Sequence, residues 1–357
     1  MCVDQQLSIK IGNASFFAAC MVVFIHAPHR FLSHDIGSAI EYFLVEGVFR
    51  CAVPFFFVVS GFFLAHHFDE YGWYKREICK RCKSLLVPYF IWSLVFGFVF
   101  AVLTLSSNHA RGLSLFNGFE TFSLVKVFGL APVVDPLSVQ LWYLRFLFTA
   151  VLVSPIFWFF LRRGIGFCFL MLTLLFIGNC ILPGSIPRSD THTFFRHFFV
   201  FNGFFYIFLG MMIFRFAEKS SLRLTWNKCL ACAICGLVLV LWNAITFYLG
   251  HENLLRQSIV STCANLLFMI AFWTVVSDRQ KTTCLNLSSL SFPIYLIHYS
   301  VVFFVSKIFT LIAGTSADLH LVRYIVTGTV SLILSFYVSR FLRLCVPGSK
   351  SILFGGR

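Results

Sequence analysis

Residues 41–64 read EYFLVEGVFRCAVPFFFVVSGFFL, a long apolar run that carries few polar side chains. An apolar stretch of this length matches a helix that spans the hydrocarbon core of a membrane. Glu46 and Arg50 are four residues apart, so they lie on one helix face and can pair. Pro54 removes a backbone donor and predicts a kink, and Ser60-Gly61 lets another helix backbone approach closely. The segment therefore predicts a bent membrane helix with a polar face.

The composition of the whole chain agrees with this segment. Of its 357 residues, 59% are hydrophobic and only 12% are charged. A soluble domain carries about 25% charged residues, and disordered chains are poor in apolar residues, so both classes are excluded. Continuous apolar runs also differ from the short alternating strands of a membrane barrel. The net charge of +14 comes from basic residues between apolar runs, which favours anionic lipid headgroups or an anionic co-substrate over nucleic acid.

Ten apolar stretches of membrane-spanning length recur along the chain. We expect an all-α polytopic membrane protein in which residues 1–357 form one domain, with no bound cofactor and no metal. A break rich in Ser, Gly and Pro at 107–139 is expected to form an external loop. The first apolar run lacks a small-residue cleavage site and is expected to be retained as a span. The predicted spans are 10–28, 43–65, 86–106, 140–161, 165–182, 197–216, 229–249, 257–277, 287–306 and 322–344.

His26 is an ionisable residue on the first predicted span. It follows Lys10 by about 24 Å of helix axis at 1.5 Å per residue, which places it in the outer half of the membrane. Ala19 and Ser15 share its face, with Ala18 and Val22 to either side. This stripe of small residues either lines a narrow passage from the cytoplasm or permits close helix packing.

Six segments carry a family resemblance, in this order along the chain: the first span ending at His26, Arg50–Phe62 with Val-Pro-Phe-Phe-Phe and Ser-Gly-Phe, the basic segment Trp73–Trp92, Leu141–Leu144, Phe204–Met211, and Ser291–His298. Together they resemble the acyltransferase 3 family, integral membrane acyltransferases of bacterial envelopes, over essentially the whole chain. The family usually carries Arg or Lys eleven residues before the first-span histidine, where this chain has Ser15. Lys10 or Arg50 are candidates for the missing charge.

The resemblance implies an enzyme of the inner membrane. It would transfer an acyl group, commonly acetyl from acetyl-coenzyme A, to a hydroxyl of an envelope polysaccharide or a lipid-linked sugar. Histidine suits the role of general base because its pKa lies near the operating pH, so His26 is the candidate base. Cationic side chains suit the phosphates of the donor. The donor-binding candidates are Ser15, Lys75, Arg76, Lys80, Arg81 and Lys83, and the acceptor or oxyanion candidates are Glu46, Arg50, Trp142, Arg145 and His298.

Other interpretations of the same residues stay open. The basic cluster at 75–83 also fits a role in topology alone, and His298 fits packing or substrate positioning. A transporter or flippase of envelope precursors is one alternative function, although no repeat is visible in the sequence. A haem electron carrier ligated by His26 and His298 is another.

The positive-inside rule predicts the orientation. With the N-terminus in the cytoplasm, 18 of the 28 Lys and Arg residues fall on the inner side and eight on the outer side. Cysteine labelling or reporter fusions should therefore place Arg76–Lys83 and the C-terminus inside and residues 107–139 outside. The opposite sidedness for Arg76–Lys83 would exclude these residues from binding a cytoplasmic donor.

Overall fold

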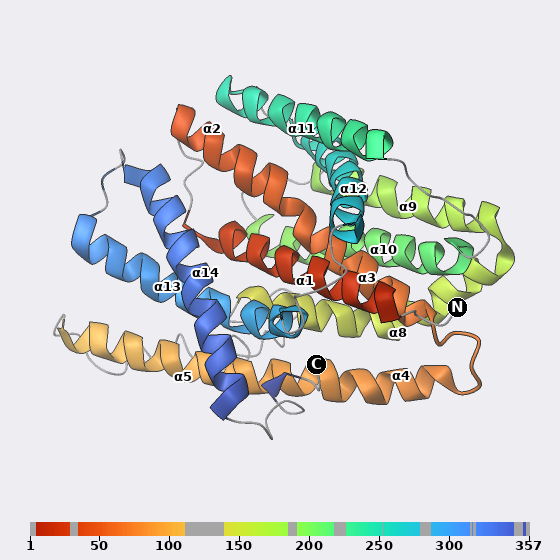
Figure 1. Cartoon of the computed structure of the whole chain (residues 1–357), viewed down its shortest axis with the longest axis horizontal. Helices are drawn as coiled ribbons and strands as arrows, with labels where there is room; N and C mark the ends of the chain where they lie inside the picture. Colours follow the sequence, from red (N-terminus) through yellow and green to blue (C-terminus); the bar gives the residue numbers. More distant parts are fainter. Residues whose placement is uncertain are drawn as a thin grey trace.

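The computed structural model describes residues 5–28, 35–110, 139–184, 191–217, 226–251, 253–278, 287–314, 316, 319–345 and 353–354. Every secondary-structure element in these ranges is helical. The elements form a bundle (Figure 1). In chain order they are α1 (Gln5–His26), α2 (Ile36–Tyr42), η1 (Phe43–Val48), η2 (Phe49–Cys51), α3 (Ala52–Ala65), α4 (Trp73–Arg81), η3 (Cys82–Leu86), α5 (Val87–Ala110), η4 (Val139–Leu141), α8 (Trp142–Arg163), α9 (Ile165–Gly184), α10 (Thr191–Ala217), α11 (Trp226–Tyr248), α12 (Leu254–Asp278), η5 (Ser288–Leu290), α13 (Ser291–Ala313) and α14 (His320–Cys345).

The predicted all-α membrane fold is confirmed. Eight helical stretches among the described residues are long and apolar enough to cross a membrane. Two shorter apolar helical stretches, Ile165–Cys180 and Gly203–Phe216, coincide with the fifth and sixth predicted spans. Helix α5 continues to Ala110, so the expected external loop begins later than predicted. Residues 111–138 of that loop lie outside the described residues.

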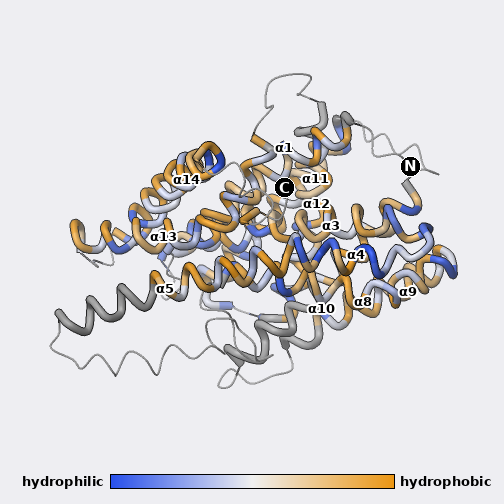
Figure 2. Tube along the Cα trace, turned by 90° about the horizontal axis from the view of Figure 1, so that it is seen from below, coloured by the Kyte–Doolittle hydropathy of each residue, from blue (hydrophilic) through white to orange (hydrophobic). Residues whose placement is uncertain are grey.

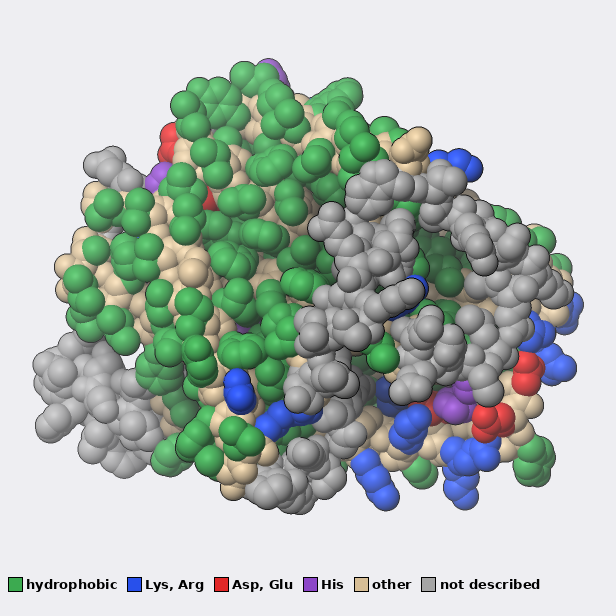
Figure 3. All heavy atoms as spheres, viewed as in Figure 1, with side chains coloured by type: hydrophobic (Ala, Val, Ile, Leu, Met, Phe, Trp, Pro, Cys, Tyr) green, Lys and Arg blue, Asp and Glu red, His purple; other side chains and the backbone are tan. Residues whose placement is uncertain are grey.

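The outer surface of the bundle is as apolar as a membrane-spanning protein requires. Large side chains such as Leu311 (85% exposed) and Phe98 (71%) face outward, where lipid replaces water. Hydrophobic side chains cover much of the upper and left-central part of the face in Figure 3, and Lys and Arg gather at its lower right, near α4. Figure 2 shows the same polarity along the chain trace, with hydrophilic residues concentrated on α4.

The second predicted span is irregular in the part that precedes Pro54. Residues 36–65 form one continuous helical stretch whose middle departs from α geometry, first as the π-helical turn η1 and then as the tight turn η2. These irregular turns lie directly before Pro54, which cannot donate to the carbonyl four residues earlier. Glu46 and Arg50 pair across them, with 3.5 Å between Oε1 and Nη1.

The basic segment at 75–83, which lies between two predicted spans, is helical. Helix α4 continues through the π-helical turn η3 into α5, and the two helices run together along the lower edge of Figure 1. Glu77 on α4 is buried, and its Oε1 accepts a hydrogen bond from Arg81 Nε at 2.6 Å. The guanidinium of Arg81 compensates the charge of the buried Glu77 carboxylate, so α4 can pack against the bundle although it is rich in charged residues.

Helices α3 and α10 approach until their backbones touch. A Cβ atom on Gly61 would overlap the carbonyl of Ile207, and one on Gly210 would overlap the carbonyl of Val58. Both glycines face backbone atoms that cannot rotate away, so neither position has room for a methyl group. The prediction that Ser60-Gly61 admits a neighbouring backbone is confirmed.

Helix α1 lies between two other helices. Ala14 and Ala18 pack in one cluster with Ala52 and Phe55 of α3. Ala19 and Val23 pack in another with Leu290 of η5 and Ile294 of α13. Small side chains on both faces therefore let α1 contact α3 and α13 together.

The Gly61–Gly210 contact predicts a measurable loss of stability. Gly61→Ala should lower the free energy of unfolding by about 1–3 kcal/mol, because the added methyl overpacks a backbone contact. Gly166→Ala on α9 is the matched control, since a Cβ there meets no atom within 4 Å. Thermal unfolding in detergent measures both. Equal midpoints for the two variants would contradict the packing argument.

Arg81 predicts a second effect on stability. Arg81→Met leaves Glu77 buried without its closest partner, which costs about 3–5 kcal/mol for a buried pair. Lys80 lies 3.9 Å from the same carboxylate with 60% of its side chain exposed, so Lys80→Met should cost less than about 1 kcal/mol. Chemical or thermal unfolding of the purified variants tests the difference. Similar losses in both variants would show that Arg81 does not anchor α4.

Candidate active site

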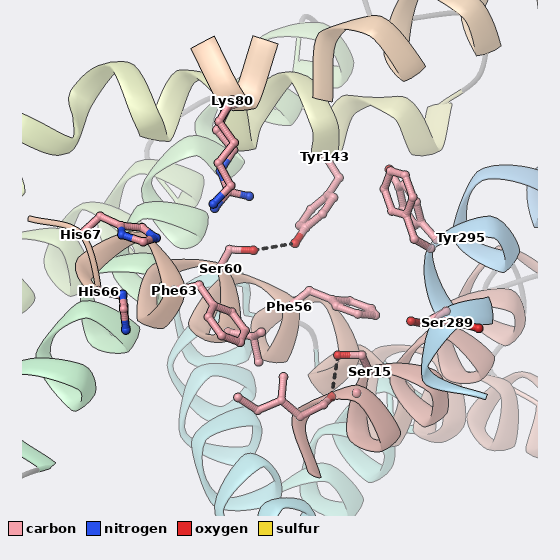
Figure 4. A pocket seen from close by; sticks show the side chains of 16 residues that line it. Ser15, Phe56, Ser60, Phe63, His66, His67, Lys80, Tyr143, Ser289 and Tyr295 are labelled. Atoms are coloured by element: carbon pink, nitrogen blue, oxygen red, sulfur yellow. Dashed lines mark hydrogen bonds between the residues drawn. The ribbon is translucent and has the colours of Figure 1, made fainter. Parts of the chain in front are cut away.

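One cavity of about 630 Å³ opens inside the bundle where α1, α3, α4, α8 and the start of α13 meet. Lys80 lies at one side, and His66 and His67 at another (Figure 4). Arg81 also lines the cavity. Three lining residues come from the first turns of α1, namely Ile11, Gly12 and Ser15. The remaining lining residues are Phe56, Val59, Ser60, Phe63, Tyr143, Ser289, Ser291, Phe292 and Tyr295.

The interior of the cavity is apolar with a few hydroxyl groups. Ser60 Oγ and Tyr143 Oη lie 3.4 Å apart across it, joined by a dashed line in Figure 4. Ser15 Oγ donates to the carbonyl of Ile11 at 2.8 Å. The Tyr295 hydroxyl donates to the carbonyl of Gln140. Such a lining suits a long, mostly apolar ligand that carries a few polar groups.

His26 and His298 meet although they lie far apart in the sequence. Their ring centroids are 5.1 Å apart, and the ring of Tyr299 lies 5.6 Å from that of His26. His26 ends α1 and is half-buried, whereas His298 on α13 is fully buried. Tyr295 connects this histidine pair to the cavity, because it lines the cavity and its ring centroid is 6.0 Å from that of His298.

The surroundings of His298 fix its tautomer. Nδ1 donates to the carbonyl of Tyr295 at 2.6 Å and also lies 3.2 Å from the carbonyl of Ile294. A neutral imidazole that donates from Nδ1 keeps a lone pair on Nε2. That atom is buried and has no hydrogen-bond partner among the described residues. His298 therefore presents an acceptor nitrogen inside the bundle, next to a second imidazole.

The passage expected along α1 does not extend from Ser15 to His26. Ser15 lines the cavity, but Ala19 and Val23, the next residues up the helix, are fully buried against Leu290 and Ile294. The small residues above Ser15 thus serve packing, the alternative that the sequence left open. The cavity instead follows α3, α8 and α13, past Ser60 and Tyr143 to Tyr295.

The structure divides the predicted donor-binding residues into two groups. Ser15, Lys80 and Arg81 line the cavity. Lys75, Arg76 and Lys83 are exposed and are not among the residues that line it. Arg76 is paired with Glu70, with 2.5 Å between Nη2 and Oε2.

His67 and Glu70 make a polar rim beside the cavity. His67 Nδ1 donates to Glu70 Oε1 at 2.8 Å. This hydrogen bond, with the charges of His67 and Arg76, lowers the pKa of the Glu70 carboxyl. The carboxyl group of Glu70 therefore stays ionised under acidic conditions in which an ordinary carboxyl would gain a proton. Its oxygen atoms remain hydrogen-bond acceptors there.

The acceptor and oxyanion candidates lie on four elements, η1, η2, α8 and α13. The pair Glu46–Arg50 is half-buried on η1 and η2, and η2 packs against α1. Trp142 packs on Phe57, with ring centroids 6.0 Å apart. Arg145 is half-buried one turn further along α8. Of these candidates, His298 is the one that the structure brings into ring contact with His26.

The geometry does not fit a haem between the two histidines. Their rings are in direct contact, tilted by 40° to one another. Two axial imidazoles must hold a flat macrocycle between them. The contact leaves no space for one, so the haem alternative is not supported.

Sequence reasoning missed several residues that line the cavity. Tyr143 and Tyr295 lie within two of the segments that carried the resemblance, Leu141–Leu144 and Ser291–His298, yet only their neighbours were named as candidates. Ser60 was noted for helix packing alone. A hydroxyl on an apolar helix is the signal that could have identified all three, because polar groups in a membrane need a partner or a task.

Comparison with known proteins places this geometry in context. The chain matches the model of the Acyl_transf_3 family, an acyltransferase domain, over residues 15–340. It is 24% identical over 310 residues to an amino-acid racemase of Enterococcus faecalis, which covers 82% of this chain and 40% of the relative. It is 25% identical over 166 residues to the succinoglycan biosynthesis protein ExoH of Rhizobium meliloti (strain 1021), which covers 43% of each protein. The matches thus span about two fifths of the length of these two relatives.

No solved structure matches the chain significantly. The family match is independent of that result and extends over most of the sequence, from Ser15 on α1 to Arg340 on α14. It includes the cavity from Ser15 onward and both histidines of the pair. With the apolar helices described above, it shows that the chain is an integral membrane protein of the Acyl_transf_3 acyltransferase family.

Proposed function

We propose that this chain is a membrane O-acyltransferase that moves an acetyl group from cytoplasmic acetyl-coenzyme A to a hydroxyl of a cell-envelope carbohydrate. The observation that carries the proposal is the contact between His26 and His298, which do not line the cavity themselves but are connected to it through Tyr295. The cavity has the cationic Lys80 and Arg81 in its lining. The family match supports acyl transfer. The name of the succinoglycan biosynthesis relative supports a carbohydrate acceptor.

The cavity suits the shape and charge of the donor. Coenzyme A joins a polyanionic nucleotide to a long, uncharged arm that ends in the thioester. Lys80 and Arg81 offer charge-assisted hydrogen bonds to the phosphates. The arm would follow the hydroxyl-lined wall past Ser60 and Tyr143, so that the thioester arrives near Tyr295.

The histidine pair supplies the proton transfer that the reaction needs. An alcohol is a poor nucleophile near neutral pH, so a base must accept its proton as the oxygen attacks the thioester carbonyl carbon. In our proposal His26 accepts this proton, the carbon–sulfur bond breaks, and the proton passes to the departing thiolate. His298 is a positioning residue, because its unprotonated Nε2 lies in a ring that contacts His26. Arg50 and Arg145 are candidates to stabilise the oxyanion.

His26 gives the direct test of this assignment. His26→Gln keeps hydrogen-bonding capacity but cannot take a proton, so acyl transfer by purified protein should fall by about 10²–10⁴-fold. His251→Gln is the matched control, because His251 is exposed in the turn after α11; its activity should be unchanged. Transfer is followed as thiol release that depends on the acceptor, which also distinguishes an enzyme from a transporter.

A His26→Gln variant with most of its activity would assign the base elsewhere, and His298 would be the next candidate. If the unmodified protein released no thiol with any envelope glycan, that result would count against acyl transfer itself. Mass spectrometry of envelope glycans with and without the gene identifies the acceptor. A loss of acetyl-sized groups is expected.

Lys80 tests the donor site without disturbing the fold. Loss of one partly exposed charge-assisted contact to a phosphate should raise the KM for acetyl-coenzyme A about tenfold, equivalent to about 1.4 kcal/mol, with little change in the KM for the acceptor. Lys80→Gln is preferred to a change at Arg81, which also anchors Glu77. Lys75→Gln is the control, since Lys75 is exposed and outside the cavity. If Lys80→Gln and Lys75→Gln had the same KM for acetyl-coenzyme A, we would conclude that the basic helix α4 serves membrane topology alone.

A further inference from the structure

Three potential metal ligands gather at the rim of the cavity, in the turn that joins α3 to α4. His66, His67 and Glu70 each offer one ligand atom, and these atoms lie within 4.8 Å of one another. Among the described residues, no other group of three or more His, Cys, Asp or Glu side chains is placed in this way. All three residues are at least partly accessible.

We propose that His66, His67 and Glu70 form a zinc-binding site at the rim of the cavity. Two imidazoles and one carboxylate are a ligand set that Zn²⁺ uses in proteins, and it leaves a fourth tetrahedral position for water or another ligand. His66 and His67 both line the cavity, so an ion held by them adjoins the space inside. Figure 4 shows the two rings side by side at one end of that space.

The present contacts show how the site would accept an ion. His67 Nδ1 and Glu70 Oε1 share a proton across 2.8 Å, and zinc binding would replace that proton between the two atoms. The ligand nitrogen must carry no proton, so the proton on Nδ1 moves to Nε2 when the imidazole is neutral and is released to solvent when the ring is an imidazolium. Arg76 holds the other oxygen of Glu70, with Nη2 and Oε2 2.5 Å apart. This contact fixes the orientation of the carboxylate, as outer partners of metal ligands do.

His66 is held in place from the other side. Its ring lies 5.5 Å from that of Phe214 on α10 and 4.8 Å from that of His67. A ring packed against a helix has fewer orientations to lose on binding. The three ligands therefore come from one short turn whose two ends are anchored by α10 and by Arg76.

The test is zinc binding to the full-length protein, purified in detergent without a polyhistidine tag. Calorimetric titration should show one site per chain that Glu70→Gln weakens at least tenfold, because a neutral amide replaces the carboxylate ligand. Asp69→Asn is the matched control: Asp69 is the adjacent acid, but it pairs with Arg215 at 2.9 Å instead of joining the cluster. Its affinity for zinc should equal that of the unmodified protein.

X-ray absorption spectroscopy of the zinc-loaded protein separates this site from the cysteines, of which Cys79 and Cys82 are the nearest in sequence. Nitrogen and oxygen neighbours at about 2.0–2.2 Å are expected, with no sulfur at about 2.3 Å. Sulfur neighbours, or equal zinc affinity in the two variants, would overturn the proposal. Binding is measured without donor or acceptor, so the result does not depend on acyltransferase activity.

Discussion

The simultaneous contact of α1 with α3 and α13 is the constraint on which the proposed site depends. Ala14 and Ala18 pack with the α3 side, and Ala19 packs against Leu290 and Ile294. Larger side chains at these positions would separate the helices and move His26 away from His298. The same contact brings the first turns of α1 to the cavity, where Ser15 lies among residues of α3, α4, α8, η5 and α13. One packing arrangement therefore positions both the histidine pair and the binding space.

Two ion pairs of this bundle are local in the sequence. Glu46 pairs with Arg50 on the same helical stretch, and Glu77 pairs with Arg81 one turn away. Charged groups are costly in a membrane unless they have partners, and local partners form as soon as the helix forms. The hydroxyls of Ser60 and Tyr143 differ, because they meet across two helices. Their contact exists only when the bundle has assembled around the cavity.

Much of the fold could be predicted from the sequence, because membrane spans depend on local composition. The ten apolar runs and the close backbone approach at Gly61 both follow from residues within one segment. The histidine contact could not be predicted in this way, since it joins residues from the first and the ninth predicted spans. Helical periodicity likewise identified the small residues that precede His26, but it could not identify the residues of other helices that pack against them. Only the tertiary structure shows that Leu290 and Ile294 fill the space above Ser15.

The π-helical turn at Cys82–Leu86 affects how the two parts of one long helix are rotated relative to each other about the helix axis. The N-terminal part carries Lys80 and Arg81, and the C-terminal part carries Trp92. A residue advances an α-helix by about 100°, and a π-helical turn holds more residues than an α-helical one. Toward the C-terminal side of this turn, Trp92 is fixed because its Nε1 donates to the carbonyl of Leu353 at 3.0 Å. A regular α-helix of the same length would keep Trp92 in place and rotate the opposite end. Lys80 and Arg81, which line the cavity, lie on the N-terminal side of this turn, so their direction relative to Trp92 includes its extra rotation.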